Sequence, residues 1–397
     1  MKSGSIRNYF DNKKQHIQEL RRELHQIPEL GFEEVETSAF VINHLQELDV
    51  KFDSGIGKTG IIARIGKPSE NVVALRADMD GLPIEEENHV SYCSRHPGRM
   101  HACGHDAHVA MLLGVVEYLK SVENEINGQV LCVFQPGEER SDGTGLTGAR
   151  HILNSGKLAG AKAILGLHVM PATAAGKFGI ISGGAMASGD LFNATIYGKG
   201  GHDAWVHETI DPIFITTQVL NAIYAIRSRK IDPLSTGTLS VGTIEAGTTA
   251  NVIPESVKIT GTIRTFDQKV RDIFVTELEK ALKLSENFGG RYELDIPFHV
   301  PVTQNSPELA EYVKQICTDL YGEDSIVEVN PSMGVEDFSW YSLQIPALFV
   351  MLGAQMEGES RTAHNPRFDI DDSILHRGSA MLSTAALSLL SEEIAKK

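Results

Sequence analysis

The stretch Met100-His-Ala-Cys-Gly-His-Asp-Ala-His108 holds three imidazoles, one thiol and one carboxylate within nine residues. Cys103 and His105 flank Gly104, so a single loop can direct a thiolate and an imidazole to the same point. Thiolates and imidazoles are ligands that zinc-type ions prefer. An apolar pattern of helical period starts just after Asp106, a residue type that suits the positive end of a helix dipole. The stretch therefore predicts a reactive loop attached to a buried helix.

The overall composition limits the classes of partner. The chain has 397 residues, of which 42% are hydrophobic and 22% charged, and this length predicts two or three globular domains. Its net charge of −16 argues against a nucleic acid or an anionic membrane as partner, because phosphate binding needs clustered Lys and Arg. The charge favours solubility instead.

Cysteine usage and the amino terminus favour a cytoplasmic protein. The four cysteines are scattered without the spacing of a disulfide framework. The first residues are charged throughout and lack the apolar core of a signal peptide. No apolar run approaches the ~18 residues that a membrane span needs.

Most of the chain alternates between strand and helix patterns, after two helices expected between residue 6 and about residue 48. This alternation predicts an α/β domain with a mostly parallel sheet. The run from Asn71 to Ala77 is nearly all apolar, as in a strand covered by helices on both faces. The predicted strands are residues 60–65, 71–77, 129–134, 161–167 and 347–352.

Titratable side chains collect just beyond the carboxyl ends of these predicted strands. In open α/β sheets this edge is where binding and catalytic sites form. Together with the Cys103 loop, these side chains predict a metal site. The positions are Asp78, Asp80, Glu138, Glu139, His168 and His364.

The region between about residue 187 and residue 298 has a different pattern. Its strands and helices are expected in the order β-α-β-β-α-β, which is the ferredoxin-like order. One of the helices is predicted from Asp211 to Arg229, with Pro212 in its first turn. The prediction is a catalytic domain of residues 1–186 and 299–397 with an inserted domain of residues 187–298.

The candidate ligands and the adjacent acids suit a two-metal hydrolase. Such enzymes hold their ions about 3.5–4 Å apart with a bridging anionic ligand, and the Cys103 thiolate can bridge. A further, uncoordinated carboxylate must move a proton from the attacking water to the leaving amine. Glu138 and Glu139 are adjacent, and neighbours in an extended backbone point to opposite sides. One of them can bind metal while the other faces the substrate, but the residues alone leave open which does which.

Motifs along nearly the whole chain resemble one known family. They are LRADMDGLPI, MHACGHDAHVAMLLG, FQPGEE, GLHVMP, GKGGH, NVIPE, GTIRTFD and MGVEDF. Together they resemble the amidohydrolase branch of the aminoacylase/carboxypeptidase metallopeptidase family, which includes hippurate hydrolases, auxin-conjugate hydrolases and archaeal carboxypeptidases. The resemblance implies metal-dependent hydrolysis of N-acyl amino acids or short peptides.

The resemblance also implies roles for single residues. Glu138 is the expected general base and acid, and Asp78 the carboxylate that orients a ligand. The implied cofactor is a pair of divalent ions, with zinc expected and cobalt or manganese as alternatives. The implied metal ligands are Cys103, His105, Glu139, His168 and His364.

The inserted domain is expected to act as a lid and to mediate a homodimer. By the resemblance, His202 polarises the scissile carbonyl, while Asn251 and Arg264 hold the substrate carboxylate. The family usually has Gly-Ser-x-Pro-His after this histidine, whereas the chain has Asp203-Ala-Trp-Val-His207. This departure leaves the substrate preference open.

Three alternatives remain at this point. The motifs do not separate an aminoacylase from a carboxypeptidase, because both need the same metals, base and carboxylate clamp. A hydrolase with Cys103 as nucleophile and His105 as base is a different mechanism. A metal-dependent binding protein without catalysis is a third, although it leaves Glu138 without a purpose.

Overall fold

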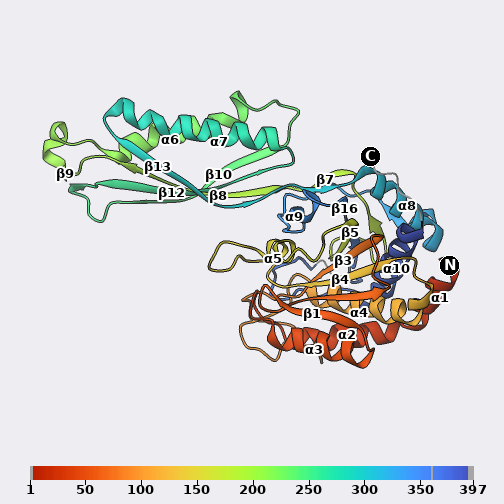
Figure 1. Ribbon diagram of the computed structural model, residues 1–397. Helices are drawn as coiled ribbons and strands as arrows, with labels where there is room; N and C mark the ends of the chain where they lie inside the picture. Colours follow the sequence, from red (N-terminus) through yellow and green to blue (C-terminus); the bar gives the residue numbers. More distant parts are fainter. Residues whose placement is uncertain (1–2, 359–360, 392–397) are drawn as a thin grey trace. The chain divides into compact units, whose positions relative to one another are not determined.

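The computed structural model of the protein describes residues 3–358 and 361–391. The chain divides into two compact units (Figure 1). The smaller unit contains the predicted insert, residues 187–298, and also residues 331–339 from the range predicted for the catalytic domain. The larger unit is Met1–Gly183, Gln304–Asn330 and Trp340–Lys397, and the smaller unit is Gly184–Thr303 and Pro331–Ser339.

The larger unit is built on an eight-stranded sheet in the order β1-β2-β4-β3-β5-β16-β6-β15. The central strands β4, β3, β5 and β16 are parallel, whereas β1, β2 and β6 join antiparallel neighbours. The predicted mostly parallel α/β sheet is therefore confirmed. The strands are β1 Lys51–Ile56, β2 Gly60–Gly66, β3 Val72–Asp78, β4 Gln129–Gln135, β5 Ala161–Met170, β6 Phe178–Gly179, β15 Ile326–Val327 and β16 Ala347–Gly353.

Helices cover the sheet and enclose the main core. Every residue of β3 and of β16 is buried, so both faces of the sheet are covered at its centre. The core joins apolar side chains of the helix after His105 to those of the first and last helices of the unit. The helices are α1 Ser3–Asn12, α2 Lys14–His25, α3 Val35–Glu47, α4 His105–Ser121, α5 Gly148–Asn154, α8 Pro307–Tyr321, α9 Ser339–Ser342 and α10 Leu375–Ser391.

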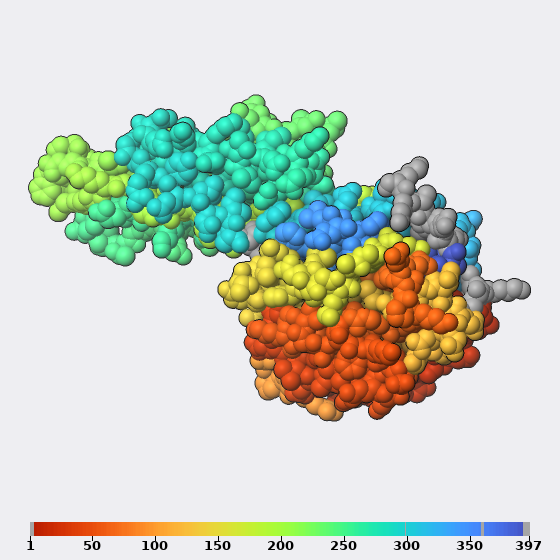
Figure 2. All heavy atoms as spheres, in the orientation of Figure 1, coloured from red at the N-terminus to blue at the C-terminus, as the bar shows by residue number. Residues whose placement is uncertain are grey.

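The amino-terminal segment differs from the sequence prediction. Two helices were expected before residue 48, but there are three, because the first predicted helix is interrupted at Lys13 and forms α1 and α2. No Pro or Gly marks this break, so the sequence carried no signal for it. In the space-filling view the visible face of the larger unit is largely red to orange, the colours of the first quarter of the chain (Figure 2).

The smaller unit has the element order β8-α6-β10-β12-α7-β13, as the sequence predicted. Its sheet has the strand order β10-β12-β8-β13, and the unit's core joins this sheet to α6 and α7. Asp211 caps α6 by accepting a hydrogen bond from Ile213 N–H, and Pro212 occupies the first turn. The elements are β8 Ser188–Tyr197, β9 Gly201–His202, α6 Pro212–Arg229, β10 Gly237–Ala246, β11 Val252–Ile253, β12 Ser256–Thr265, α7 Gln268–Lys283 and β13 Arg291–Val300.

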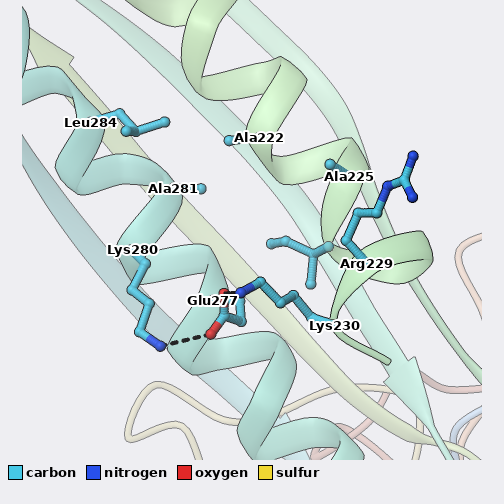
Figure 3. A pocket seen from close by; sticks show the side chains of 9 residues that line it. Ala222, Ala225, Arg229, Lys230, Glu277, Lys280, Ala281 and Leu284 are labelled. Atoms are coloured by element: carbon cyan, nitrogen blue, oxygen red, sulfur yellow. Dashed lines mark hydrogen bonds and ion pairs between the residues drawn. The ribbon is translucent and has the colours of Figure 1, made fainter. Parts of the chain in front are cut away.

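A groove of about 260 Å³ lies between α6 and α7 of the smaller unit (Figure 3). Its floor includes Ala222, Ala225 and Ala281, and Glu277 on its rim pairs with Lys280 at 2.7 Å. None of the predicted site residues lines this groove. Two short strands, β7 Gly183–Met186 and β14 Thr303–Asn305, lie where the chain passes between the two units.

Among the residues that the structure describes, no helix combines the length and the hydropathy of a membrane-spanning segment.

Candidate metal centre

The loop before α4 presents Cys103 and His105 to the same space. Gly104 lies between them with φ +91°, a left-handed conformation that glycine adopts without strain. A side chain at this position would also collide with Val169 of β5. His105 is the first residue of α4, so the buried helix holds its imidazole in place.

Two histidines have one ring nitrogen fixed by a backbone carbonyl. His105 Nδ1 lies 2.8 Å from the carbonyl oxygen of Asp80, and His168 Nδ1 lies 2.8 Å from that of Val169. Because a carbonyl only accepts, the proton of each neutral ring sits on Nδ1 and the lone pair on Nε2. His168 Nε2 lies 3.4 Å from Cys103 Sγ. His168 is inside β5 rather than beyond its end, because the strand continues to Met170.

Glu139 and His364 approach Cys103 from two other segments. Glu139 follows β4, and its Oε1 lies 3.0 Å from His364 Nε2. His364 has φ +61°, an uncommon backbone conformation for a residue with a side chain. Such strain clusters at functional sites.

The five predicted ligands form two groups that share the thiol. Cys103, His105 and His168 have donor atoms within 4.8 Å of one another, and so have Cys103, Glu139 and His364. His105 Nε2 is buried and forms no hydrogen bond with any residue that the structure describes. A donor set of thiolate, imidazole and carboxylate around this buried nitrogen fits a pair of divalent ions.

Glu138 lies beside these groups. Its carboxylate lies within 4.8 Å of the donor atoms of His105 and Glu139, yet it belongs to neither group that contains Cys103. Glu139, in contrast, belongs to one of the two groups that contain Cys103.

The local charges have direct effects on proton binding in the metal-free protein. Burial and the Glu139 carboxylate raise the pKa of the Cys103 thiol, the opposite of an activated nucleophile. Hydrogen bonds with Cys103 and Glu139 raise the pKa of His364 to about 10. Burial lowers the pKa of His168 to about 3, so its lone pair is free at neutral pH. The thiol's raised pKa disfavours the cysteine-nucleophile alternative.

Asp78 is fully buried next to the candidate ligand His105. It accepts hydrogen bonds from Arg76 at 2.7 Å and from His108 Nδ1 at 2.5 Å. Its carboxylate lies 3.5 Å from Nε2 of His105. His105 is thus contacted at Nε2 by the Asp78 carboxylate and at Nδ1 by the Asp80 carbonyl. His108 accepts the Val169 N–H at 3.0 Å, so both of its nitrogens are occupied.

Two further buried acids, Asp80 and Glu34, lie next to this site; the sequence placed Asp80 at the metal site without a specific role and did not indicate Glu34. Each accepts hydrogen bonds from the turn that carries Glu138 and Glu139. The position of Asp80, two residues after Asp78 at the edge of the sheet, was a usable signal. Glu34 lies about a hundred residues before the turn and carried none.

The smaller unit holds the other three predicted residues. His202 in β9 pairs with Val252 in β11, directly after Asn251, so these two predicted residues lie together. His202 Nδ1 accepts the Ala204 N–H at 3.1 Å and lies 2.8 Å from Asp203 Oδ1.

Arg264 is separate from that pair within the unit. It lies near the end of β12 and donates to the Met333 carbonyl at 3.3 Å.

Comparisons with known proteins agree with this arrangement. Residues 74–388 match the model of peptidase family M20/M25/M40. Thermostable carboxypeptidase 2 of Saccharolobus solfataricus is 38% identical over 91% of this chain and 92% of its own length. IAA-amino acid hydrolase ILR1-like 4 of Arabidopsis thaliana is 38% identical over 94% of this chain and 85% of its own.

A solved structure extends the similarity to the whole fold. The YXEP protein of Bacillus subtilis, a dinuclear metal-binding peptidase of the M20 family, superposes with a TM-score of 0.82. It is 32% identical and covers 95% of this chain and 98% of its own. The resemblance inferred from the motifs is thus confirmed, and the chain belongs to peptidase family M20/M25/M40, a family of metal-dependent hydrolases of amide bonds.

Proposed function

We propose that the protein hydrolyses the amide bond of N-acyl amino acids or short peptides and releases a free amino acid. The observation that carries this proposal is the position of the Glu138 carboxylate. It lies beside the two groups of candidate ligands that share the Cys103 thiol, and it belongs to neither group. The relatives named as a carboxypeptidase and as an IAA-amino acid hydrolase support the substrate class.

Cys103, His105 and His168 would hold one ion, and Cys103, Glu139 and His364 the other. When bound, such a pair supplies Lewis-acid polarisation of the carbonyl and lowers the pKa of water. Glu138 then takes a proton from the attacking water and delivers it to the leaving nitrogen. Zinc is the ion we propose, with cobalt and manganese as alternatives, since thiolate and imidazole together suit zinc.

His202 is proposed to donate a hydrogen bond to the oxygen of the scissile carbonyl. A neutral ring that accepts from Ala204 N–H carries its proton on Nε2, and a cationic ring that pairs with Asp203 also has a proton there. Nε2 is a donor in both states. Arg264, with Asn251, is proposed to bind the substrate carboxylate, for which a guanidinium fork is well shaped.

These lid residues also support the proposed homodimer. His202 and Asn251 lie at the paired strands β9 and β11. Strand β11 is followed closely by Ser256, where β12 begins (Figure 1). Arg264 is eight residues further along β12, or roughly 26 Å at the usual rise per residue. Groups this far apart in one unit contact the same small substrate only if they come from two copies of the chain.

Complementation between inactive variants tests the dimer. His202→Ala and Arg264→Ala are each expected to be inactive, whereas mixed and refolded together they should regain about a quarter of the activity, because half of the dimers contain one intact site. A mass measurement gives the oligomeric state directly. Monomers in solution, or a mixture that stays inactive, would remove this part of the proposal.

Glu138→Gln tests the catalytic role. The variant should keep both metal ions and lose about 10²–10⁴-fold in kcat, the usual contribution of a general base. Glu139→Gln is the matched control, since it removes a ligand and should lower metal content as well. Turnover that survives complete removal of metal would contradict the mechanism, and an unchanged Glu138→Gln would favour a binding protein.

A panel of N-acyl amino acids and blocked dipeptides separates an aminoacylase from a carboxypeptidase. All four cysteines are free thiols, which supports our proposal of a reducing, cytoplasmic location. Fractionation of cells that express the protein checks that location.

A further inference from the structure

The turn that carries Glu138 and Glu139 is held by its backbone on two buried carboxylates. The Gly137 N–H donates to Glu34 Oε1 at 2.8 Å. The Glu138 N–H donates to Asp80 Oδ1 at 3.1 Å, and the Glu139 N–H donates to Asp80 Oδ2 at 3.0 Å. Three successive amides therefore point at two acids, which are 0% and 1% exposed.

Asp80 also contacts a candidate ligand. Its carbonyl oxygen accepts from His105 Nδ1 at 2.8 Å, and its Oδ1 lies 3.3 Å from the same nitrogen. One residue thus touches the His105 imidazole and the backbone of both Glu138 and Glu139. A carboxyl group with two acceptor oxygens can hold two neighbouring amides at once.

Glu34 is itself fixed from another part of the chain. The Thr59 hydroxyl donates to Glu34 Oε2 at 2.6 Å, which leaves Oε1 for Gly137. Gly137 has φ +51°, and a side chain there would meet the ring of Phe32. The turn is therefore held by two segments that are distant in sequence, and Thr59, from another part of the chain, fixes one of them.

We propose that Asp80 is a positioning residue of this centre, which sets the place of Glu138 and Glu139 relative to His105, with Glu34 as the second anchor of the turn. The consequence for catalysis rests on the proposed function of Glu138. The anchoring itself rests on the hydrogen bonds alone. Displacement of a catalytic group by about 1 Å can cost on the order of 10²-fold in rate.

Asp80→Asn tests the proposal. It keeps the size of the side chain but turns one acceptor into a donor that faces an amide donor. In the metal-free protein, exchange of the Glu138 and Glu139 amides, followed by NMR, should accelerate about 10-fold or more. Affinity for zinc, measured against a competing chelator, should fall about 10–100-fold, as for other residues behind metal ligands. The kcat should fall by a similar factor, with KM nearly unchanged.

Asp372→Asn is the matched control. Asp372 is also a buried aspartate of the larger unit, but it accepts hydrogen bonds from Gln18 and Arg22, not from the turn. This variant should leave amide exchange at the turn, zinc affinity and kcat unchanged. If it altered all three as Asp80→Asn does, a general loss of buried charge would explain the effect and the proposal would be wrong.

The outcomes distinguish this proposal from the proposed function. A wild-type protein without activity on any N-acyl amino acid or peptide would defeat the function, while amide exchange and zinc affinity still test the anchoring. A folded Asp80→Asn with wild-type exchange and affinity would overturn the anchoring. If Asp80→Asn does not fold, Glu34→Leu, which removes both acceptor oxygens, should accelerate exchange at Gly137 with Glu138 and Glu139 less affected, and unchanged exchange at Gly137 would equally overturn it.

Discussion

Glu34 is a buried carboxyl group whose ionisation is opposed by its surroundings. Burial, followed by the nearby Asp80 carboxylate, raises its pKa from 4.5 to about 7. The folded state therefore binds this proton more tightly than the unfolded state does. The stability that the group contributes is complete below about pH 4.5 and is lost as the pH rises through about 7.

Because this contribution to stability falls as the pH rises, Glu34→Gln should change the pH dependence of the unfolding free energy. Between about pH 5 and pH 8, the metal-free wild type should lose up to about 3 kcal/mol of unfolding free energy relative to the variant. Urea unfolding of both proteins at several pH values measures the difference. Parallel curves across this range would show that Glu34 does not titrate differently on folding.

Arg21 is a fully buried cation that joins two segments next to the metal centre. It donates to Asp106, the residue after His105, at 2.7 Å and to Asp369 at 3.0 Å. Its neighbour Arg22 pairs with Asp372 at 2.8 Å but is 44% exposed. The two arginines form similar ion pairs in very different surroundings.

The difference between Arg21 and Arg22 predicts that substitution by Met lowers the unfolding free energy by unequal amounts. Arg21→Met removes a buried guanidinium from two buried carboxylates and should destabilise the protein by about 3–5 kcal/mol. Arg22→Met should cost less, about 1 kcal/mol, because the Arg22 side chain is 44% exposed and Asp372 keeps its hydrogen bond from Gln18. Denaturant unfolding of both variants gives the comparison. Equal losses would mean that burial does not control the strength of these pairs.

At the scale of elements, α4 and the loop before it decide how two ligands are presented. The helix is buried along almost its whole length, so its first residue, His105, has a fixed place. The loop needs a left-handed residue without a side chain at Gly104, because Val169 occupies the adjoining space. Both the left-handed backbone and the lack of space for a side chain therefore require glycine at position 104, between Cys103 and His105.

Gly104→Ala should therefore disrupt the centre more than an ordinary glycine substitution. We expect a loss of about 1–2 kcal/mol from the left-handed backbone, a further 1–3 kcal/mol from the collision, and reduced zinc content. Gly145→Ala is the control: it also has a positive φ, +80°, but open space around it. Thermal unfolding and elemental analysis of both variants test this. Normal zinc content in a folded Gly104→Ala would contradict it.

At the scale of the whole molecule, the proposed ligands come from four separate parts of the larger unit. The loop before α4, the turn after β4, strand β5 and the segment after β16 each supply at least one. A metal that binds only when these parts are assembled stabilises the fold. At a free concentration a thousand times Kd, the gain is about 4 kcal/mol.

Calorimetry with and without a chelator checks this coupling. Removal of metal should lower the unfolding temperature of the larger unit, and added zinc should restore it. Glu139→Gln is expected to remove most of the response, because it deletes one donor of the second group. An unfolding temperature that does not respond to metal in the wild type would show that no ion bridges these segments.

The sequence by itself determined the fold class, the family and the parts of the chain that meet at the site. Its strands at 71–77 and 347–352 are long apolar runs, and such local patterns survive into the fold because burial on both faces requires them. The Cys103-Gly-His105 loop and the adjacent Glu138 and Glu139 were recognisable because their spacing itself brings reactive groups together.

Only the tertiary structure decided which groups hold those residues in place. Glu34 meets Gly137 across 103 positions, and Asp80 meets Glu138 across 58, so no local pattern reveals either contact. The same holds for the contact of Asp78 with His108, thirty positions further along the chain. Hydrogen-bond partners of a buried acid depend on which segments the packing brings near it, and that is settled only when the whole sheet is assembled.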